Sequence, residues 1–415
     1  MVGFLTLILL VPATMVGFLV GEREQRQDEA MQEAGSKWGN MQTITGPILS
    51  VPYTANKVTK NIYFLPAELN ISGDINPQIL KRGIYEITAY NSKLKVEGQF
   101  NQPNFSQWGI SSGNVLWNEA KILIGLSDMR GVKDKITMNW NDNILILNPG
   151  MSATKISDSG VSVMAPLDLK SAKTYKFSFD LNLNGSQSLN FIPLGKETNI
   201  NLASKWANPS FDGAFLPDQR QVSKDGFTAQ WKILSLNRNY PQSFSESDSY
   251  SIKDSAFGVK FLVPIDQYQK ITRSVKYAIM FIALTFLTFF FVEIFNKKRI
   301  HPIQYLLVGF ALLVFYTLLL SISEHTNFNF AYILSSIATI ILITLYSKAI
   351  FKNNFLSLLL GCILIILYGF MYVVLQLQDY ALLMGSIGLF IVLAAVMYAS
   401  RKIDWYSFTF ITNNK

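Results

Sequence analysis

The chain has 415 residues, half of them hydrophobic and only 15% charged, and a formal net charge of +8. Soluble domains carry about 25% charged residues, so this composition argues against a wholly soluble protein. Most charged residues fall within residues 21–276, where 28 basic and 24 acidic side chains are interspersed. Such mixed signs are not typical of a nucleic-acid-binding surface, and we expect no nucleic-acid partner.

Residues 1–20 are uncharged and mostly apolar. A helix of this length spans the ~30 Å hydrocarbon core of a bilayer. No small-x-small cleavage pattern follows, so we read the segment as a retained transmembrane helix rather than a signal peptide. Two acid-first i,i+4 pairs predict that a juxtamembrane helix continues over residues 21–39. These pairs are Glu22/Arg26 and Glu33/Lys37. Gly17 and Gly21 have the spacing that lets a second helix approach closely, as in a homo-oligomer.

Residues 40–270 are typical of β-strands and turns. Apolar residues alternate with polar ones, which predicts strands that bury one face. The clearest run is Tyr175, Phe177, Phe179, Leu181 and Leu183. Asn184-Gly185 and Asp225-Gly226 are dipeptides typical of hairpin turns. We expect one large β-rich domain, and the pattern leaves open whether it holds one sandwich or two.

Residues 271–405 are predicted to form five further spans. They lie at 277–295, 303–322, 330–347, 355–375 and 380–399. Their connectors alternate between basic ones and ones that carry only Glu324 or Asp379. Since cytoplasmic loops are enriched in Lys and Arg, residues 21–276 are expected outside and the tail, 406–415, in the cytoplasm. The sequence thus predicts an α+β membrane protein with six transmembrane helices, one N-terminal and five C-terminal. A large β-rich domain follows the first helix.

No constellation typical of catalysis or metal binding is visible. Residues 109–113, Gly-Ile-Ser-Ser-Gly, match the nucleophile-elbow pattern, but residues 21–276 contain no histidine to act as its base. His301 and His325 are separated by about 36 Å of helix, and Cys362 is the single cysteine. We therefore expect no catalytic residue, no cofactor and no metal site, and read 109–113 as a turn.

Two polar positions near predicted span ends have alternative interpretations. Glu293 lies about one turn from a basic loop, where it would pair with Lys297 or reach the membrane interface. The Glu324-His325 pair at the outer end of a span is either a pH-sensitive contact with the outer domain or an ordinary helix-end polar pair.

Several short motifs follow one another in an order known from one protein family. They include Gly21-Glu22-Arg23, Trp38-Gly39, Gly46-Pro47-Ile48-Leu49, Ser127-Asp128-Met129-Arg130-Gly131, Leu236-Asn237-Arg238, His301-Pro302-Ile303-Gln304-Tyr305 and Ser323-Glu324-His325. On these motifs the chain resembles the CreD family of bacterial inner-membrane proteins, also called cell envelope integrity proteins. The resemblance covers nearly the whole chain. It departs at the start, where the basic residues expected before the first span are absent.

The resemblance implies a bacterial inner-membrane protein with a periplasmic domain at residues 21–276. It also implies links to envelope integrity, to a two-component regulatory system and to altered tolerance of colicins and β-lactams. The resemblance identifies no catalytic residue in this chain. We expect a non-enzymatic protein of the envelope stress response whose outer domain binds an unknown envelope protein, glycan or lipid, besides the lipid bilayer itself. A membrane enzyme or transporter that handles lipid or cell-wall precursors is the alternative. The candidates for coupling the domain to the helices are Arg23, Arg26, Trp38, Glu293, Glu324 and His325.

Overall fold

The structure, a computed structural model, describes residues 2–83, 85–151, 153, 155–168, 173–261, 267–295, 300–377 and 380–401. The chain forms two compact units. Residues 27–265 make up the β unit, and residues 1–26 together with 266–415 make up the helical unit. Helix α1 (Val2–Trp38) begins in the helical unit and ends in the β unit. The predicted transmembrane and juxtamembrane segments at the N-terminus are therefore one continuous helix.

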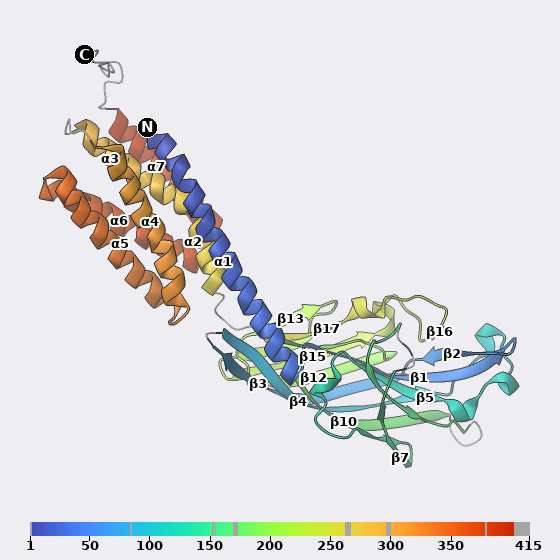
Figure 1. The fold of residues 1–415 in the computed structure, drawn as a ribbon. Helices are drawn as coiled ribbons and strands as arrows, with labels where there is room; N and C mark the ends of the chain where they lie inside the picture. Colours follow the sequence, from blue (N-terminus) through green and yellow to red (C-terminus); the bar gives the residue numbers. More distant parts are fainter. Residues whose placement is uncertain are drawn as a thin grey trace. The chain divides into compact units, whose positions relative to one another are not determined.

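The β unit contains two large sheets (Figure 1). The nine-stranded sheet has the order β13-β17-β11-β1-β5-β9-β8, with β2 paired to β1 and β16 paired to β2. Its strands are β1 (Gln42–Ala55), β2 (Val58–Phe64), β5 (Lys121–Leu126), β8 (Asn148–Pro149), β9 (Gly160–Met164), β11 (Ser188–Phe191), β13 (Pro209–Gly213), β16 (Ser243–Ser245) and β17 (Phe257–Phe261).

The eight-stranded sheet has the order β14-β15-β12-β3-β4-β10-β6-β7. Its strands are β3 (Glu68–Arg82), β4 (Tyr85–Asn101), β6 (Thr137–Trp140), β7 (Asn143–Ile146), β10 (Thr174–Ser186), β12 (Glu197–Ser204), β14 (Gln219–Ser223) and β15 (Gly226–Leu234). Most neighbours are antiparallel, but β1 and β11 are parallel, and so are β3 and β12. Parallel neighbours need a crossover connection, so both sheets join strands that are far apart in the sequence.

One hydrophobic core lies between the two sheets. A single cluster of buried residues draws on strands of both, and aromatic rings meet across it. The ring centroids of Tyr90 on β4 and Phe261 on β17 are 5.1 Å apart. Those of Trp231 on β15 and Phe257 on β17 are 5.8 Å apart. The alternating residues predicted on β10 all face this core, and Phe227, Ala229, Trp231 and Ile233 on β15 do the same. The β unit is therefore one sandwich, which answers the question left open by the sequence.

The predicted turn at Asn184-Gly185 is wrong, whereas the other one is confirmed. Residues 184 and 185 lie inside β10, and a Cβ at Gly185 would come within 2.3 Å of the Tyr90 hydroxyl oxygen. Glycine is required there for close packing rather than for a turn. Strands β14 and β15 do form a hairpin at the second predicted turn: Lys224 and Asp225 make the turn, and Gly226 is the first residue of β15, opposite Ser223.

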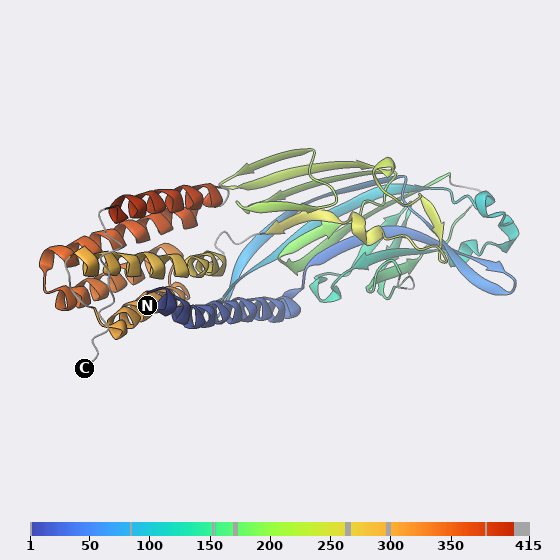
Figure 2. The same ribbon diagram turned by 90° about the horizontal axis from the view of Figure 1, so that it is seen from above.

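The helical unit contains most of α1 and six further helices, which run alongside one another (Figure 1, Figure 2). They are α2 (Gln267–Lys276), α3 (Ala278–Phe295), α4 (Pro302–Ser323), α5 (Phe328–Phe351), α6 (Asn354–Gln376) and α7 (Ala381–Ser400). Among the described residues four helices are long and apolar enough to cross a membrane, and a fifth span results if α2 and α3, bent by 43°, count as one. The described apolar stretch of α7, Leu383–Tyr398, is shorter. Four to five candidate spans are thus found where six were predicted.

Side-chain caps explain where three of these helices begin. His301 Nδ1 accepts a hydrogen bond from the Ile303 amide at the start of α4, and the Gln304 side chain accepts one from the His301 amide. The side chains of Asn327 and Asn353 accept backbone hydrogen bonds at the starts of α5 and α6. These contacts satisfy amides that the first helical turn leaves unpaired.

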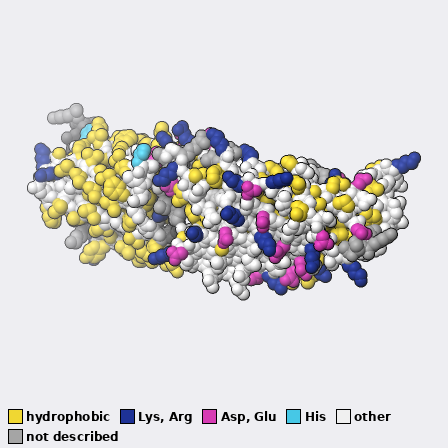
Figure 3. Space-filling model, turned by 90° about the horizontal axis from the view of Figure 1, so that it is seen from below, with side chains coloured by type: hydrophobic (Ala, Val, Ile, Leu, Met, Phe, Trp, Pro, Cys, Tyr) yellow, Lys and Arg dark blue, Asp and Glu magenta, His cyan; other side chains and the backbone are white. Residues whose placement is uncertain are grey.

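The surfaces of the two units differ in chemistry. Large apolar side chains are exposed along the helices, for example Leu345 at 64% and Phe355 at 72%. Hydrophobic side chains cover the helical part in Figure 3, whereas charged side chains of both signs are scattered over the β unit. A surface of exposed apolar side chains is favourable in contact with lipid and costly in water.

Candidate functional site

The structure brings Arg23 and Glu324 together in the helical unit. The Arg23 Nε lies 3.7 Å from Glu324 Oε1, and the Tyr268 hydroxyl donates to the same oxygen at 3.3 Å. The Glu324 side chain is only 11% exposed, so two donors compensate a largely buried carboxylate. His325 is exposed beside it, and its backbone amide donates to the Ile322 carbonyl at the end of α4.

The other coupling candidates lie elsewhere. Arg26 pairs with Glu22 at 2.6 Å, as the i,i+4 spacing predicted. Trp38 is in the β unit, where its indole Nε1 donates to the Tyr90 carbonyl at 3.3 Å. Arg26 and Trp38 are thus anchored separately, one in each unit.

Glu293 lies at the opposite end of α4 from Glu324. Its carboxylate accepts hydrogen bonds from the Tyr305 hydroxyl at 3.0 Å and from the Ile300 amide at 3.4 Å. Nineteen residues separate Tyr305 from Glu324, which is about 28 Å of helix. The predicted partner, Lys297, lies outside the described residues.

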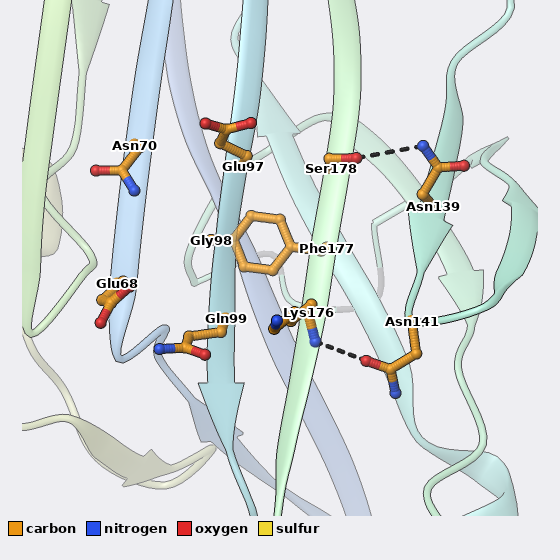
Figure 4. A pocket seen from close by; sticks show the side chains of 10 residues that line it. All are labelled: Glu68, Asn70, Glu97, Gly98, Gln99, Asn139, Asn141, Lys176, Phe177 and Ser178. Carbon is orange, nitrogen blue, oxygen red and sulfur yellow. Dashed lines mark hydrogen bonds between the residues drawn. The ribbon is translucent and has the colours of Figure 1, made fainter. Parts of the chain in front are cut away.

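Two rows of polar side chains cross four strands on the outer face of the eight-stranded sheet (Figure 4). They border a shallow depression of about 350 Å³. One row contains Asn70, Glu97, Ser178 and Asn139, and the other contains Glu68, Gln99, Lys176 and Asn141. The rows are two residues apart along each strand, or about 7 Å. The depression is therefore a groove that runs across the strands.

The floor of the groove lies at Gly98 and Phe177, which are directly opposite each other on β4 and β10. A Cβ at Gly98 would come within 2.8 Å of the Phe177 ring, so glycine lets that buried ring fill the space below. The two rows form the rim of the groove, and hydrogen bonds within each row hold some of their side chains in place. Asn139 donates to the Ser178 hydroxyl at 3.2 Å, and the Asn141 side chain accepts from the Lys176 amide at 2.8 Å.

The rim offers hydrogen-bonding groups of both kinds. Carboxylates and amide oxygens accept, and amide nitrogens and the lysine ammonium donate. Glu68 and Lys176 are exposed on either side of the partly buried Gln99. A polar ligand lying in the groove would meet donors and acceptors from both rows. The sequence alone did not reveal this site, because its members come from strands that pair only in the folded sheet.

A buried network at the start of β1 was also missed as a site. Asp128 accepts hydrogen bonds from the Asn40 amide at 2.9 Å and from the Arg130 side chain at 2.8 and 2.9 Å. Burial alone would raise the pKa of the Asp128 carboxyl. The hydrogen bonds from the Arg130 side chain and from the backbone amides outweigh burial, and the pKa lies below its usual value. The buried Gln42 side chain donates to the carbonyls of Asp128 and Asn184. The network ties three segments together, and the signal for it was the Asp128-Met129-Arg130-Gly131 motif.

The remaining predictions concern chemistry. Residues 109–111 link two short 3₁₀ turns, Ser106–Trp108 and Ser112–Asn114, and residues 112 and 113 belong to the second turn, so the segment does not join a strand to a helix. The segment is therefore a turn, as its sequence predicted. Within the described ranges no group of three or more His, Cys, Asp or Glu side chains is placed to hold a metal ion.

A β-sandwich joined to several apolar helices of membrane-spanning length defines a multi-pass membrane protein with a large polar domain. The family described as "Inner membrane protein CreD" matches residues 1–406. The chain is 33% identical to Inner membrane protein CreD of Escherichia coli (strain K12) over 416 residues, which cover 97% of this chain and 92% of that protein. The chain belongs to the CreD family of inner-membrane proteins, as its motifs predicted.

Proposed function

We propose that this protein supports envelope integrity by binding an envelope component on its β unit, without catalysing a reaction. In this proposal six helices span the inner membrane, residues 21–276 are periplasmic and the C-terminus is cytoplasmic. The alternation of basic and acidic connectors supports that orientation. The alternative is a membrane enzyme or transporter that handles lipid or cell-wall precursors.

The polar groove of the eight-stranded sheet is the observation that supports a binding role best. Its two rows present carboxylates, amides and an ammonium at regular spacing across four strands. Such groups hydrogen-bond sugar hydroxyls and acetamido groups well. We therefore propose a glycan chain of the envelope as the ligand, lying across the strands between the two rows.

Replacing Glu68 and Gln99 together with alanine is expected to weaken glycan binding about tenfold. These residues are opposite each other on β3 and β4, and each lost hydrogen bond costs roughly 0.5–1.5 kcal/mol. The measurement is co-sedimentation of the purified full chain with isolated peptidoglycan. Asp74→Ala with Lys93→Ala is the matched control, because this exposed pair lies opposite on the same two strands outside the groove.

Equal binding by both variants would contradict the groove as the site. If the unchanged protein failed to bind glycan but converted labelled envelope lipids in bilayers, the alternative function would replace this one.

The coupling role of Arg23, Arg26, Trp38, Glu293, Glu324 and His325 is part of the same proposal. Arg23, Arg26 and Trp38 all lie on α1, whose first part belongs to the helical unit and whose last part belongs to the β unit. The anchoring of Glu324 by Arg23 and Tyr268 supports a role for the outer end of α4. Glu293 would act at the far end of that helix by holding Tyr305.

Alanine at Arg26, Trp38 and His325 is expected to abolish complementation of an envelope-tolerance defect while the protein still folds. Folding should survive because none of the three side chains is fully buried, and in this proposal they carry the coupling between the domain and the helices. The measurement is β-lactam tolerance of a bacterial strain that lacks its own family member and carries the variant. Full complementation by a triple variant that accumulates to normal levels would refute the coupling role.

A further inference from the structure

A second pocket lies in the β unit, where β16 pairs with β2 in the nine-stranded sheet. It has a volume of about 390 Å³, and its lining includes Tyr63, Lys155, Phe244, Glu246, Asp248 and Tyr250. We call it the β16 pocket. None of its described lining residues borders the groove of the eight-stranded sheet, so the two sites are separate.

Three aromatic rings form one wall of the β16 pocket. Tyr63 on β2 and Phe244 on β16 are directly opposite each other, so both side chains lie on the same face of the sheet. Their ring centroids are 5.5 Å apart, and those of Phe244 and Tyr250 are 5.7 Å apart. Ligand pockets commonly combine such an apolar wall with a few polar groups.

Two carboxylates line the β16 pocket, and hydrogen bonds hold each of them by one oxygen. Glu246 Oε2 accepts from the backbone amide of Asn61 at 3.3 Å and from its side-chain amide at 3.0 Å. Asp248 Oδ2 accepts from the Ser245 amide at 2.8 Å. Within the described ranges neither carboxylate has an ion pair, and Glu246 Oε1 and Asp248 Oδ1 accept no hydrogen bond. Each carboxylate therefore keeps one oxygen for a ligand.

The hydroxyl of Tyr63 is also without a hydrogen-bond partner in the part of the chain that the structure describes. The residue is 4% exposed and borders the pocket. Burial and the nearby charge of Glu246 raise the pKa of Tyr63 to about 12, so the hydroxyl stays protonated and offers both a donor and an acceptor. A buried hydroxyl without a partner is costly, and a polar ligand group in the pocket would offset that cost.

The charge of the β16 pocket favours a cation. Lys155 is the one cation among its described lining residues, and its Nζ donates to the Glu246 backbone carbonyl at 3.1 Å rather than to a carboxylate. Lys253, which follows the lining residue Ile252, is paired with Asp158 at 3.2 Å. The described lining residues thus carry two negative charges and one positive charge, and a further cation would be attracted.

We propose that the β16 pocket binds the primary ammonium group of an alkylamine, with its carbon chain against the aromatic wall. A primary ammonium has three donors, and the pocket offers three acceptors: Glu246 Oε1, Asp248 Oδ1 and the Tyr63 hydroxyl. The faces of the aromatic rings attract such a cation as well. Two sources carry this group, a free diamine and the lysine-like side chain of a peptide. Amine binding here and glycan binding by the groove are independent of each other.

Glu246→Gln/Asp248→Asn is expected to weaken the binding of cadaverine, a short linear diamine, by about tenfold or more. Both amides keep an oxygen for the existing hydrogen bonds of the loop but lack the negative charge. Isothermal titration calorimetry of the full chain in detergent measures the dissociation constant. The matched control, Glu119→Gln/Asp142→Asn, makes the same chemical change at two exposed carboxylates outside the pocket and should bind like the unchanged protein.

Two further probes are measured on the unchanged protein, so they remain informative even if a variant fails to fold. Nα-acetyllysine amide presents the ammonium group on a peptide-like unit, and whichever of this probe and cadaverine binds more tightly identifies the source. The trimethylated form of the lysine probe keeps the charge but loses the N–H donors of the ammonium. It should bind about tenfold more weakly or worse than the unmodified probe.

Lys155→Gln separates the sign of the ligand's charge from the integrity of the pocket. It removes a competing positive charge, so cadaverine should bind at least as tightly as to the unchanged protein. A loss equal to that of Glu246→Gln/Asp248→Asn would overturn the proposal. Equal cadaverine binding by Glu246→Gln/Asp248→Asn and its control, equal binding of the trimethylated and unmodified lysine probes, or no binding of either amine by the unchanged protein would also overturn it.

Discussion

Replacing Asp128 with alanine is expected to lower the free energy of unfolding of the β unit by about 3 kcal/mol. Its carboxylate is 7% exposed and accepts hydrogen bonds from Asn40 and Arg130. Removing one member of a buried charged network leaves the others without partners and costs roughly 3–5 kcal/mol when burial is complete. The Arg130 side chain is half exposed and can hydrogen-bond to water once its partner is removed. We therefore expect a loss at the lower end of that energy range.

Tryptophan fluorescence of the full chain in detergent, followed through urea unfolding, measures this loss, because six of the seven tryptophans lie in the β unit. Asp158→Ala is the matched control. Its carboxylate is 87% exposed and pairs with Lys253 on the surface, so we expect a change below about 0.5 kcal/mol. Equal effects of the two variants would contradict the structural role of Asp128.

The same network predicts a dependence on pH. The folded-state pKa of Asp128 is lowered, so its contribution to stability is fully present above the ordinary aspartate pKa of about 3.9. That contribution is lost as the pH falls through the folded-state pKa. The unchanged protein should therefore lose more stability than Asp128→Asn on acidification below about pH 4. Parallel stability curves for the two proteins would refute this assignment.

Replacing Arg238 with methionine is expected to cost about 3 kcal/mol as well. The residue is 8% exposed, and its guanidinium donates to the carbonyls of Tyr240 at 2.6 Å and of Leu194 at 3.3 Å. It also contacts the Gln242 side chain and lies 4.3 Å from the Tyr240 ring centroid. Burial lowers the pKa of Arg238, yet arginine stays charged in proteins. Methionine would fill the volume but leave buried carbonyls without donors.

Lysine at position 238 should also destabilise, because one ammonium cannot reproduce the planar fork that reaches separate carbonyls. Urea unfolding is again the measurement. Arg220→Met is the control, since this exposed side chain only approaches the Phe211 ring, at 5.9 Å. If Arg238→Met were as stable as Arg220→Met, the guanidinium would not be holding this part of the sandwich together.

Local sequence patterns predicted the strands and helices whose formation depends on the spacing of apolar residues along the chain. Alternation identified the inward face of β10, because a strand that buries one face must place apolar side chains at every second position. Runs of apolar residues identified α3 to α6 to within a few residues, because only a long apolar helix is stable in lipid. The Asn184-Gly185 error shows the limit. From the sequence alone, a glycine that is needed for packing against Tyr90 cannot be distinguished from a glycine that is needed for a turn.

Tertiary structure alone decided which distant residues meet. The pairing of Arg23 with Glu324, the contact of Asn40 with Asp128 and the groove shared by β3, β4, β10 and β6 all join segments far apart in the chain. No local propensity encodes such partners, because they follow from strand order and helix packing, which depend on the whole core. The sequence by itself therefore determined the class of protein, its membrane helices and its β-rich domain. The sandwich topology and the helix packing determined where its polar side chains converge.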